Sequence, residues 1–130
     1  AMLAHLSDRD RQAALDRQSF HRFTPSTLDR EALEAEMPEI RAEGVAWDRE
    51  EHEAGIVCLA APILSRGGRV LGAASITSTL AEGGLEGLMT YRQDIIAMVR
   101  AIAEETHAWR FPDLADTDQT HPVRRLTWQR

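Results

Sequence analysis

The sequence predicts an α+β fold, in which helices pack on an antiparallel sheet. Two runs of apolar and β-branched residues, 55–64 and 70–79, flank a short segment with two adjacent glycines, which is the pattern of a β-hairpin. Apolar residues at helical spacing occur both before and after these strands. A chain of 130 residues is long enough for one domain with a hydrophobic core. Helices covering a hairpin-based sheet are therefore expected.

The first helix is predicted over residues 2–16. Ser7 is suited to act as its N-cap, with Asp10 at the third following position. Residues 18–27 contain two phenylalanines and a proline and are expected to form a connector.

The second helix is predicted over residues 29–43, with Ser26 or Thr27 as its cap. Pro38 removes one backbone donor, so a kink or a break is expected there. Gly44 is the expected C-terminal stop. Apolar residues spaced by four and three positions define one helical face, made of Leu33, Met37 and Ile40.

Three strands are predicted after this helix. A short apolar run covers residues 45–47, and the two longer runs form the hairpin around residues 65–69. Because the longer runs are almost continuously apolar, both faces of the sheet are expected to be covered, with helices on one side.

The last helix is predicted over residues 88–109, after a loop at 81–87. The tail, residues 111–130, has little periodicity and is expected to be poorly ordered or docked on a partner, with Trp128 as its large anchor. The expected apolar face of the helix consists of Ile95, Val99, Ile102 and Ala103.

The composition argues against direct contact with DNA. Acidic residues outnumber basic ones by 21 to 15, and no basic stripe is visible. Cys58 is the single cysteine, so no intramolecular disulfide can form. With no apolar run long enough for a membrane span and no signal-peptide pattern, a cytoplasmic location is expected.

The most specific pattern runs from Phe23 to Thr79. It contains Thr-Pro-Ser-Thr at 24–27, a helix that ends Arg-Ala-Glu-Gly-Val-Ala at 41–46, and an aspartate followed by paired glutamates. A Cys-Leu-Ala-Ala-Pro strand and a last strand with alternating hydroxyl side chains follow. Over about residues 1–109 this pattern resembles the effector-binding domain of the IclR family of bacterial transcriptional regulators.

The resemblance implies a GAF-like antiparallel sheet with helices packed on it, holding a small organic effector in a pocket on the sheet. Family members carry an N-terminal winged helix-turn-helix and assemble as homodimers and tetramers. This chain contains no such segment, so DNA is expected to be bound only through a winged-helix domain absent from it. Residues 1–110 are expected to form a partial sensor domain that lacks the family's first half.

The resemblance also implies the ligand-binding residues. Asp48 matches the pocket-edge aspartate, Ile56 and Cys58 match positions facing the effector, and Ser75 and Thr77 match the alternating hydroxyls. Residues two apart on a strand share a face, which agrees with both pairs. A buried hydroxyl without a partner costs about 1–3 kcal/mol, and a ligand oxygen would supply the partner.

Three departures from the family pattern bear on the effector rather than on the fold. Val45 stands where the family usually has tyrosine, Thr77 replaces the second serine, and residues 78–81 differ from the usual Gly-Pro and Ser-Arg.

The predicted function is therefore a ligand sensor that binds a carboxylate or aromatic-derived effector and transmits binding through the arrangement of subunits. No cofactor, catalytic residue or metal site is expected. One alternative is an effector-free dimerisation module that uses helix 88–109 and an exposed sheet.

The other alternative is a metal- or thiol-dependent hydrolase. A cluster at 50–53 resembles a metal site, but alternating faces separate its side chains, and solvated loop charge is the preferred interpretation. Cys58 lacks a basic partner fixed by the sequence, which a catalytic thiol requires.

Overall fold

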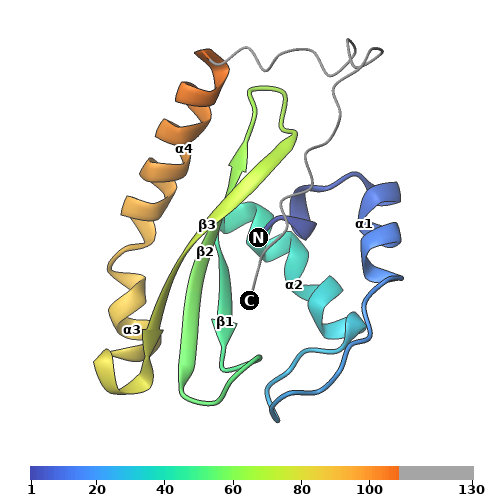
Figure 1. Ribbon diagram of the computed structural model, residues 1–130, viewed down its shortest axis with the longest axis vertical. Helices are drawn as coiled ribbons and strands as arrows, with labels where there is room; N and C mark the ends of the chain where they lie inside the picture. Colours follow the sequence, from blue (N-terminus) through green and yellow to red (C-terminus); the bar gives the residue numbers. More distant parts are fainter. Residues whose placement is uncertain (109–130) are drawn as a thin grey trace, which may run out of the picture.

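The structure is a computed structural model that describes residues 1–108, so the predicted tail at 111–130 lies outside the described residues. Helices precede and follow a three-stranded sheet, which confirms the α+β class (Figure 1). In chain order the elements are η1 (Leu3–His5), α1 (Asp8–Leu15), α2 (Arg30–Glu43), β1 (Ala46–Arg49), β2 (Ile56–Leu64), β3 (Val70–Thr79), η2 (Leu80–Glu82), α3 (Gly84–Met89) and α4 (Arg92–Ala108).

The sheet is antiparallel, with the strand order β1-β2-β3, and the hairpin forms where it was predicted. Its turn is closed by hydrogen bonds between Ser65 and Arg69, whose backbone N–H donates to Ser65 Oγ over 3.0 Å. Figure 1 shows α3 and α4 on one side of the sheet and η1, α1 and α2 on the other. Within the described part of the chain, no helix combines the length and apolar character needed to cross a membrane.

Two hydrophobic clusters hold these layers together. The larger lies between the sheet and the α3–α4 pair, and its buried members are Val45, Val57, Leu59, Ala61, Leu88, Ile95 and Val99. The smaller joins the N-terminal segment to α2 and to the first residue of β1, through Ala4, Leu15, Met37, Ile40 and Ala46. Burial of these side chains supplies the main free energy of folding.

The first predicted helix is interrupted. A short 3-10 turn, η1, ends before Leu6, which is extended, and α1 begins only after Ser7. Ser7 is the N-cap as predicted, because its side chain accepts the Asp10 backbone N–H. A residue that caps a helix must leave helical geometry, so the same serine that starts α1 prevents one continuous helix from residue 2.

Helix α2 begins and continues differently from the prediction. Asp29 is the cap, and its Oδ1 accepts the Ala32 backbone N–H over 2.9 Å; Ser26 and Thr27 lie in the preceding loop. The helix runs unbroken through Pro38, which is exposed. Gly44 ends it in the left-handed region, at φ 75°, as expected.

The expectation that both faces of the sheet are covered is wrong for β3. Its residues alternate between half-buried and exposed, and the uncovered face presents Leu71, Ala73, Ser75 and Thr77. Strand β3 is also an edge of the sheet in the described residues. A continuous apolar run does not require two covered faces in β3, because small residues such as alanine tolerate exposure.

The C-terminal helical region also differs from the prediction. Residues 84–87, predicted as loop, belong to α3, and a break around Thr90 within the predicted helix separates α3 from α4. The buried face of α4 contains Ile95 and Val99, as expected, whereas Ile102 is 36% exposed. Ile96 packs against the larger cluster and Ile102 does not, although both lie three residues from Val99.

Candidate functional site

Three predicted ligand-binding residues lie in one row across the sheet. Asp48 on β1 is paired with Cys58 on β2, and Cys58 is paired with Thr77 on β3. Directly opposed residues project from the same face, and the Cys58 Sγ and Thr77 Oγ1 atoms are 3.2 Å apart. The row thus presents a carboxylate, a thiol and a hydroxyl side by side.

The two remaining predicted residues share this face. Ser75 is paired with Ala60, two residues along β2 from Cys58, and Ile56 lies two residues in the other direction. Ala46, on the same face of β1, packs with α2 in the smaller cluster. The face is therefore covered by α2 at the β1 end and open at the β3 end, where Ser75 and Thr77 are exposed.

A hollow of about 440 Å³ adjoins the β1 end of this row. Asp48 lines it, whereas Ile56, Cys58, Ser75 and Thr77 do not. Its apolar side comes from the N-terminal segment, the connector and the start of α2, and its polar side comes from the loop after β1. The residues that line it are Leu3, Gln18, Ser19, Phe20, His21, Phe23, Thr27, Leu28, Leu33, Asp48, Glu51 and His52.

Two threonines tie the rim of the hollow together. Thr24 Oγ1 donates to the Glu50 carbonyl over 2.6 Å, and Thr27 Oγ1 donates to the Glu51 carbonyl. Thr27 Oγ1 also accepts the backbone N–H groups of Phe23, over 3.0 Å, and Thr24, over 2.9 Å. These bonds join segments more than twenty residues apart, so the Thr-Pro-Ser-Thr turn fixes the loop that carries Glu51.

The loop after β1 is also held by its own carboxylates. Asp48 Oδ1 accepts the Glu51 backbone N–H over 2.8 Å, and Glu50 Oε2 accepts the Gly55 N–H over the same distance. Glu50 has a φ of 63° and Phe20 a φ of 48°, and these are the only non-glycine residues with positive φ in the described chain. Both lie at or beside the hollow, and strained backbone of this kind clusters at ligand sites.

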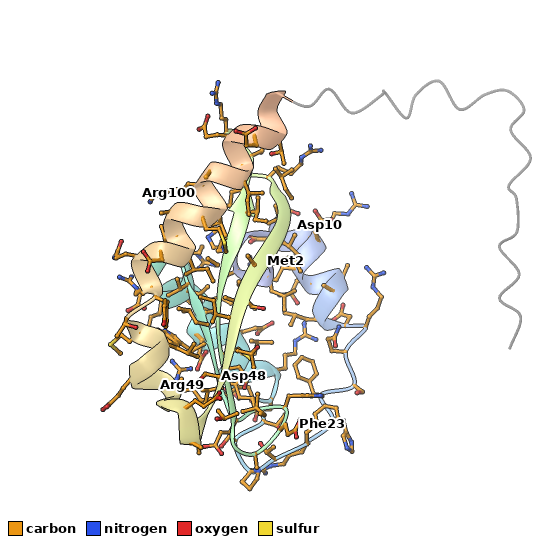
Figure 2. The ribbon with its side chains drawn as sticks, turned by 60° about the vertical axis from the view of Figure 1, so that its left-hand side comes forward. Met2, Asp10, Phe23, Asp48, Arg49 and Arg100 are labelled. Atoms are coloured by element: carbon orange, nitrogen blue, oxygen red, sulfur yellow. The ribbon has the colours of Figure 1, made fainter. Side chains whose placement is uncertain are left out.

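Aromatic rings stand at the mouth of the hollow. The Phe23 ring centroid is 4.9 Å from that of His21 and 4.6 Å from that of His52. Phe23 is 59% exposed, and Figure 2 shows it at the same end of the molecule as Asp48. A flat or apolar ligand could pack against these rings.

The electrostatics of the hollow centre on Glu51. Burial raises the pKa of its carboxyl group, and the neighbouring carboxylates of Asp48 and Glu36 raise it further. The Arg49 backbone N–H, which donates to Glu51 Oε1 over 3.4 Å, and the positive charge of the Arg49 side chain oppose this rise in pKa. The loop after β1 therefore gives the hollow a negative wall.

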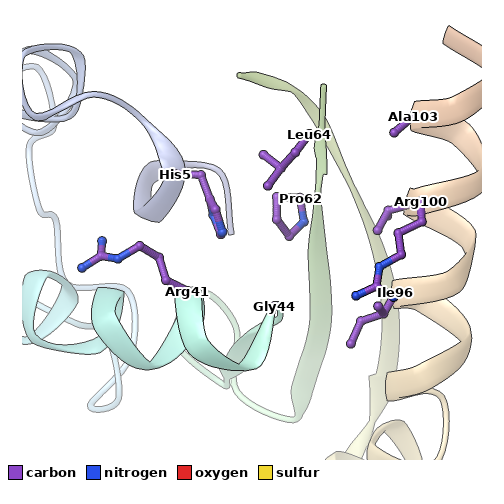
Figure 3. A pocket seen from close by; sticks show the side chains of 9 residues that line it. His5, Arg41, Gly44, Pro62, Leu64, Ile96, Arg100 and Ala103 are labelled. Carbon is purple, nitrogen blue, oxygen red and sulfur yellow. The ribbon is translucent and has the colours of Figure 1, made fainter. Parts of the chain in front are cut away.

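A second hollow, of about 310 Å³, lies between α4 and the η1–α2 side of the sheet (Figure 3). Arg100 lines it from α4, and His5 and Arg41 line it from the other side. Figure 3 shows the Arg41 guanidinium turned away from α4, and its Nη1 donates to the Ala4 carbonyl over 3.0 Å. Arg41 thus holds the N-terminal segment on α2, and none of the predicted site residues lies here.

The sequence did not reveal that Thr27, Glu51 and His52 line one hollow, or that Thr24 is bonded to the loop that carries Glu51. Sequence motifs mark the threonines and the paired glutamates, but the hydrogen bonds between these two groups join residues more than twenty positions apart. Among residues 1–108, no group of three or more histidine, cysteine, aspartate or glutamate side chains is arranged to hold a metal ion.

Comparison with known protein families adds a close match. Residues 1–106 match the family model described as "Bacterial transcriptional regulator IclR C-terminal". The chain is 31% identical over 106 residues to the HTH-type transcriptional regulator XynR of Escherichia coli, covering 78% of this chain and 42% of XynR. It spans less than half the length of the curated relatives it matches.

Solved structures agree with this match. The C-terminal domain of the E. coli transcriptional regulator KdgR is 29% identical and has a TM-score of 0.70, with 80% of this chain and 65% of that chain covered. The inducer-binding domain of PobR from Acinetobacter, solved as a complex with 3-hydroxybenzoic acid, has a TM-score of 0.60. At 23% identity, with 80% of this chain and 58% of that chain covered, the likeness to PobR shows the fold alone.

Proposed function

We propose that this chain, which belongs to the IclR family of bacterial transcriptional regulators, binds a small organic effector beside Asp48 and on the adjoining sheet face. The observation that carries the proposal is the row of Asp48, Cys58 and Thr77, which ends at a 440 Å³ hollow. Ligand sites in proteins commonly have about this volume, with apolar walls and a few polar groups.

The five residues implied by the resemblance have distinct roles in this proposal. Asp48 contacts the effector from the hollow, and Ser75 and Thr77 donate hydrogen bonds to its acid or carbonyl oxygens. Ile56 and Cys58 form the floor between them. A carboxylate or an aromatic-derived acid fits this set, because hydroxyl donors meet its oxygens and Phe20 and Phe23 offer ring contacts.

Effector binding would act through subunit arrangement. Met98 and Ile102 are exposed along α4 and Tyr91 is exposed just before it, which supports the assembly of this domain into dimers or tetramers through that helix. A ligand that prefers one arrangement shifts the population toward it. The helix-turn-helix for which the curated relatives are named would lie outside the part matched by this chain.

We take the domain to be a sensor and not an enzyme, since its family consists of regulators. The effector-free dimerisation module is a second candidate, favoured by the exposed apolar residues of α4 and by the exposed face of β3. The two candidates differ in whether a ligand binds at all.

The test is isothermal titration calorimetry with 3-hydroxybenzoate and a panel of small carboxylates. The wild-type chain is expected to bind at least one of them. The double variant Ser75→Ala/Thr77→Val should bind that compound at least tenfold more weakly, because it loses two hydroxyl donors. Ser78→Ala, on the opposite face of the same strand, is the matched control and should bind normally.

Equal affinity of wild type and the double variant would remove Ser75 and Thr77 from the site. Absence of binding by every compound, together with a stable dimer in light scattering, would favour the dimerisation module. Circular dichroism of each variant establishes that the fold is intact.

A further inference from the structure

We infer that the effector turns a hydroxyl group, and not a carboxylate, toward Asp48 and Glu51, so that these two residues select a hydroxy acid over a dicarboxylic acid. This inference rests on the proposed function, and it names Glu51 as a specificity residue. It concerns the orientation of the ligand in the hollow as well as its chemical class.

The charge of the hollow carries the first step. Asp48 and Glu51 both line it; among the described lining residues none is an arginine, and the basic side chains there are those of His21 and His52. A second carboxylate entering here would face two like charges, and repulsion between charges a few ångströms apart is considerable where water is partly excluded. The rise in the pKa of Glu51 has burial and the nearby Asp48 among its causes, as expected of such a negative pocket.

The hydrogen-bonding capacity of the wall carries the second step. An ionised carboxylate is only an acceptor. Beside the two carboxylates, the Glu51 N–H donates to Asp48 Oδ1 over 2.8 Å and the Thr27 hydroxyl donates to the Glu51 carbonyl. The other side chains of the lining that can donate are Gln18, Ser19, His21 and His52. To bond with the carboxylates of Asp48 and Glu51 themselves, a ligand must bring its own donor, and a hydroxyl group does so without adding charge.

The opposite end of the row carries the third step. Ser75 and Thr77 are exposed hydroxyls, which can donate to a carboxylate. Thr77 lies two strands away from Asp48, which corresponds to about 10 Å measured across the strands. A ligand with its acid group at the β3 end and a hydroxyl at the β1 end would match this order of acceptors and donors.

Two matched pairs of compounds test the inference on the 130-residue chain. 3-Hydroxybenzoate is compared with isophthalate, in which a second carboxylate replaces the hydroxyl, and gluconate is compared with glucarate. In calorimetry, the hydroxy acid of any pair that binds should be preferred at least tenfold. In the variant Asp48→Asn/Glu51→Gln this preference should fall below threefold, because both amides keep the shape without the charge.

The control variant Glu39→Gln/Glu53→Gln also removes two charges but alters exposed side chains that do not line the hollow. It should keep the tenfold preference. A preference that falls equally in this control reflects net charge and overturns the inference.

The remaining outcomes separate the two proposals. A dicarboxylate that binds wild type as well as its hydroxy acid, or a preference that survives Asp48→Asn/Glu51→Gln, overturns the inference while the sensor function stands. Absence of binding by all four compounds contradicts the sensor function for these acids, and the inference fails with it.

Discussion

The structure gives Glu51 a different environment from the one that its sequence context predicts. In the sequence it is one of two adjacent glutamates in a charged loop, a pattern that predicts solvated side chains. In the fold it lines a hollow, its N–H donates to Asp48, and its carbonyl accepts a threonine hydroxyl. Its neighbour Glu50 instead closes the loop through Gly55.

The raised pKa of Glu51 predicts a pH dependence of stability. A folded-state pKa above the ordinary value of 4.5 means that the folded chain holds this proton more tightly than the unfolded chain. Stability from this group is therefore present below pH 4.5 and is lost as the pH rises through the folded-state pKa. The unfolding free energy of Glu51→Gln should therefore exceed that of wild type by an amount that increases as the pH is raised from 4 to 7.

Urea denaturation at several pH values measures this difference. Glu53→Gln removes one exposed charge from the same loop, and subtracting its profile isolates the effect of burial. A pH-independent difference between Glu51→Gln and wild type would contradict the account.

The predicted site residues were partly accessible to reasoning from the sequence. Strand periodicity places Cys58 with Ile56 and Ser75 with Thr77, and the observed register confirms that all four share one face. The partners of Thr24 and Thr27 were not accessible, because hydroxyl bonds to carbonyls more than twenty residues away depend on how two loops meet.

At the scale of elements, helix ends were predicted best where a residue acts locally. Ser7 and Gly44 perform their roles through their own backbone geometry. The cap of α2 was wrong because several candidates precede the helix, and Asp29 rather than Ser26 or Thr27 accepts a first-turn N–H. Thr27 is instead engaged with the loop after β1.

Gly44→Ala tests the end of α2. At φ 75° an alanine is strained even though nothing lies within 4 Å of the added Cβ, so unfolding free energy should fall by about 1–2 kcal/mol. Gly67→Ala, whose nearest neighbour is Ser65 Oγ at 4.0 Å and whose φ is not positive, should cause no such loss. Chemical denaturation of both variants gives the comparison, and equal losses would contradict the conformational explanation.

At the scale of the whole molecule, two clusters on opposite sides of the sheet hold the described residues together. One contains Ile95 of α4 and the other contains Ile40 of α2. The sheet lies between them, with β1 contributing Ala46 to one cluster and Trp47 to the other.

Ile40→Val and Ile95→Val test whether these clusters act independently. Each removes one buried methylene and should lower the unfolding free energy by about 0.5–1.5 kcal/mol. Because the residues belong to separate clusters, the double variant should lose the sum to within about 0.5 kcal/mol. Urea titrations measure the unfolding free energies of all three variants. A deviation from additivity above about 0.5 kcal/mol would show that the two clusters are energetically coupled through the sheet.

The sequence by itself determined the α+β class, the hairpin, the C-terminal end of α2 and the family resemblance, because these depend on local periodicity, turn residues and motif order. Only the tertiary structure decided that one face of β3 is uncovered, that Thr27, Asp48 and Glu51 line one hollow, and that Thr24 is bonded to the loop after β1. These features arise from contacts between segments distant in the chain, and the free energy of such contacts depends on their arrangement in space rather than on neighbouring residues.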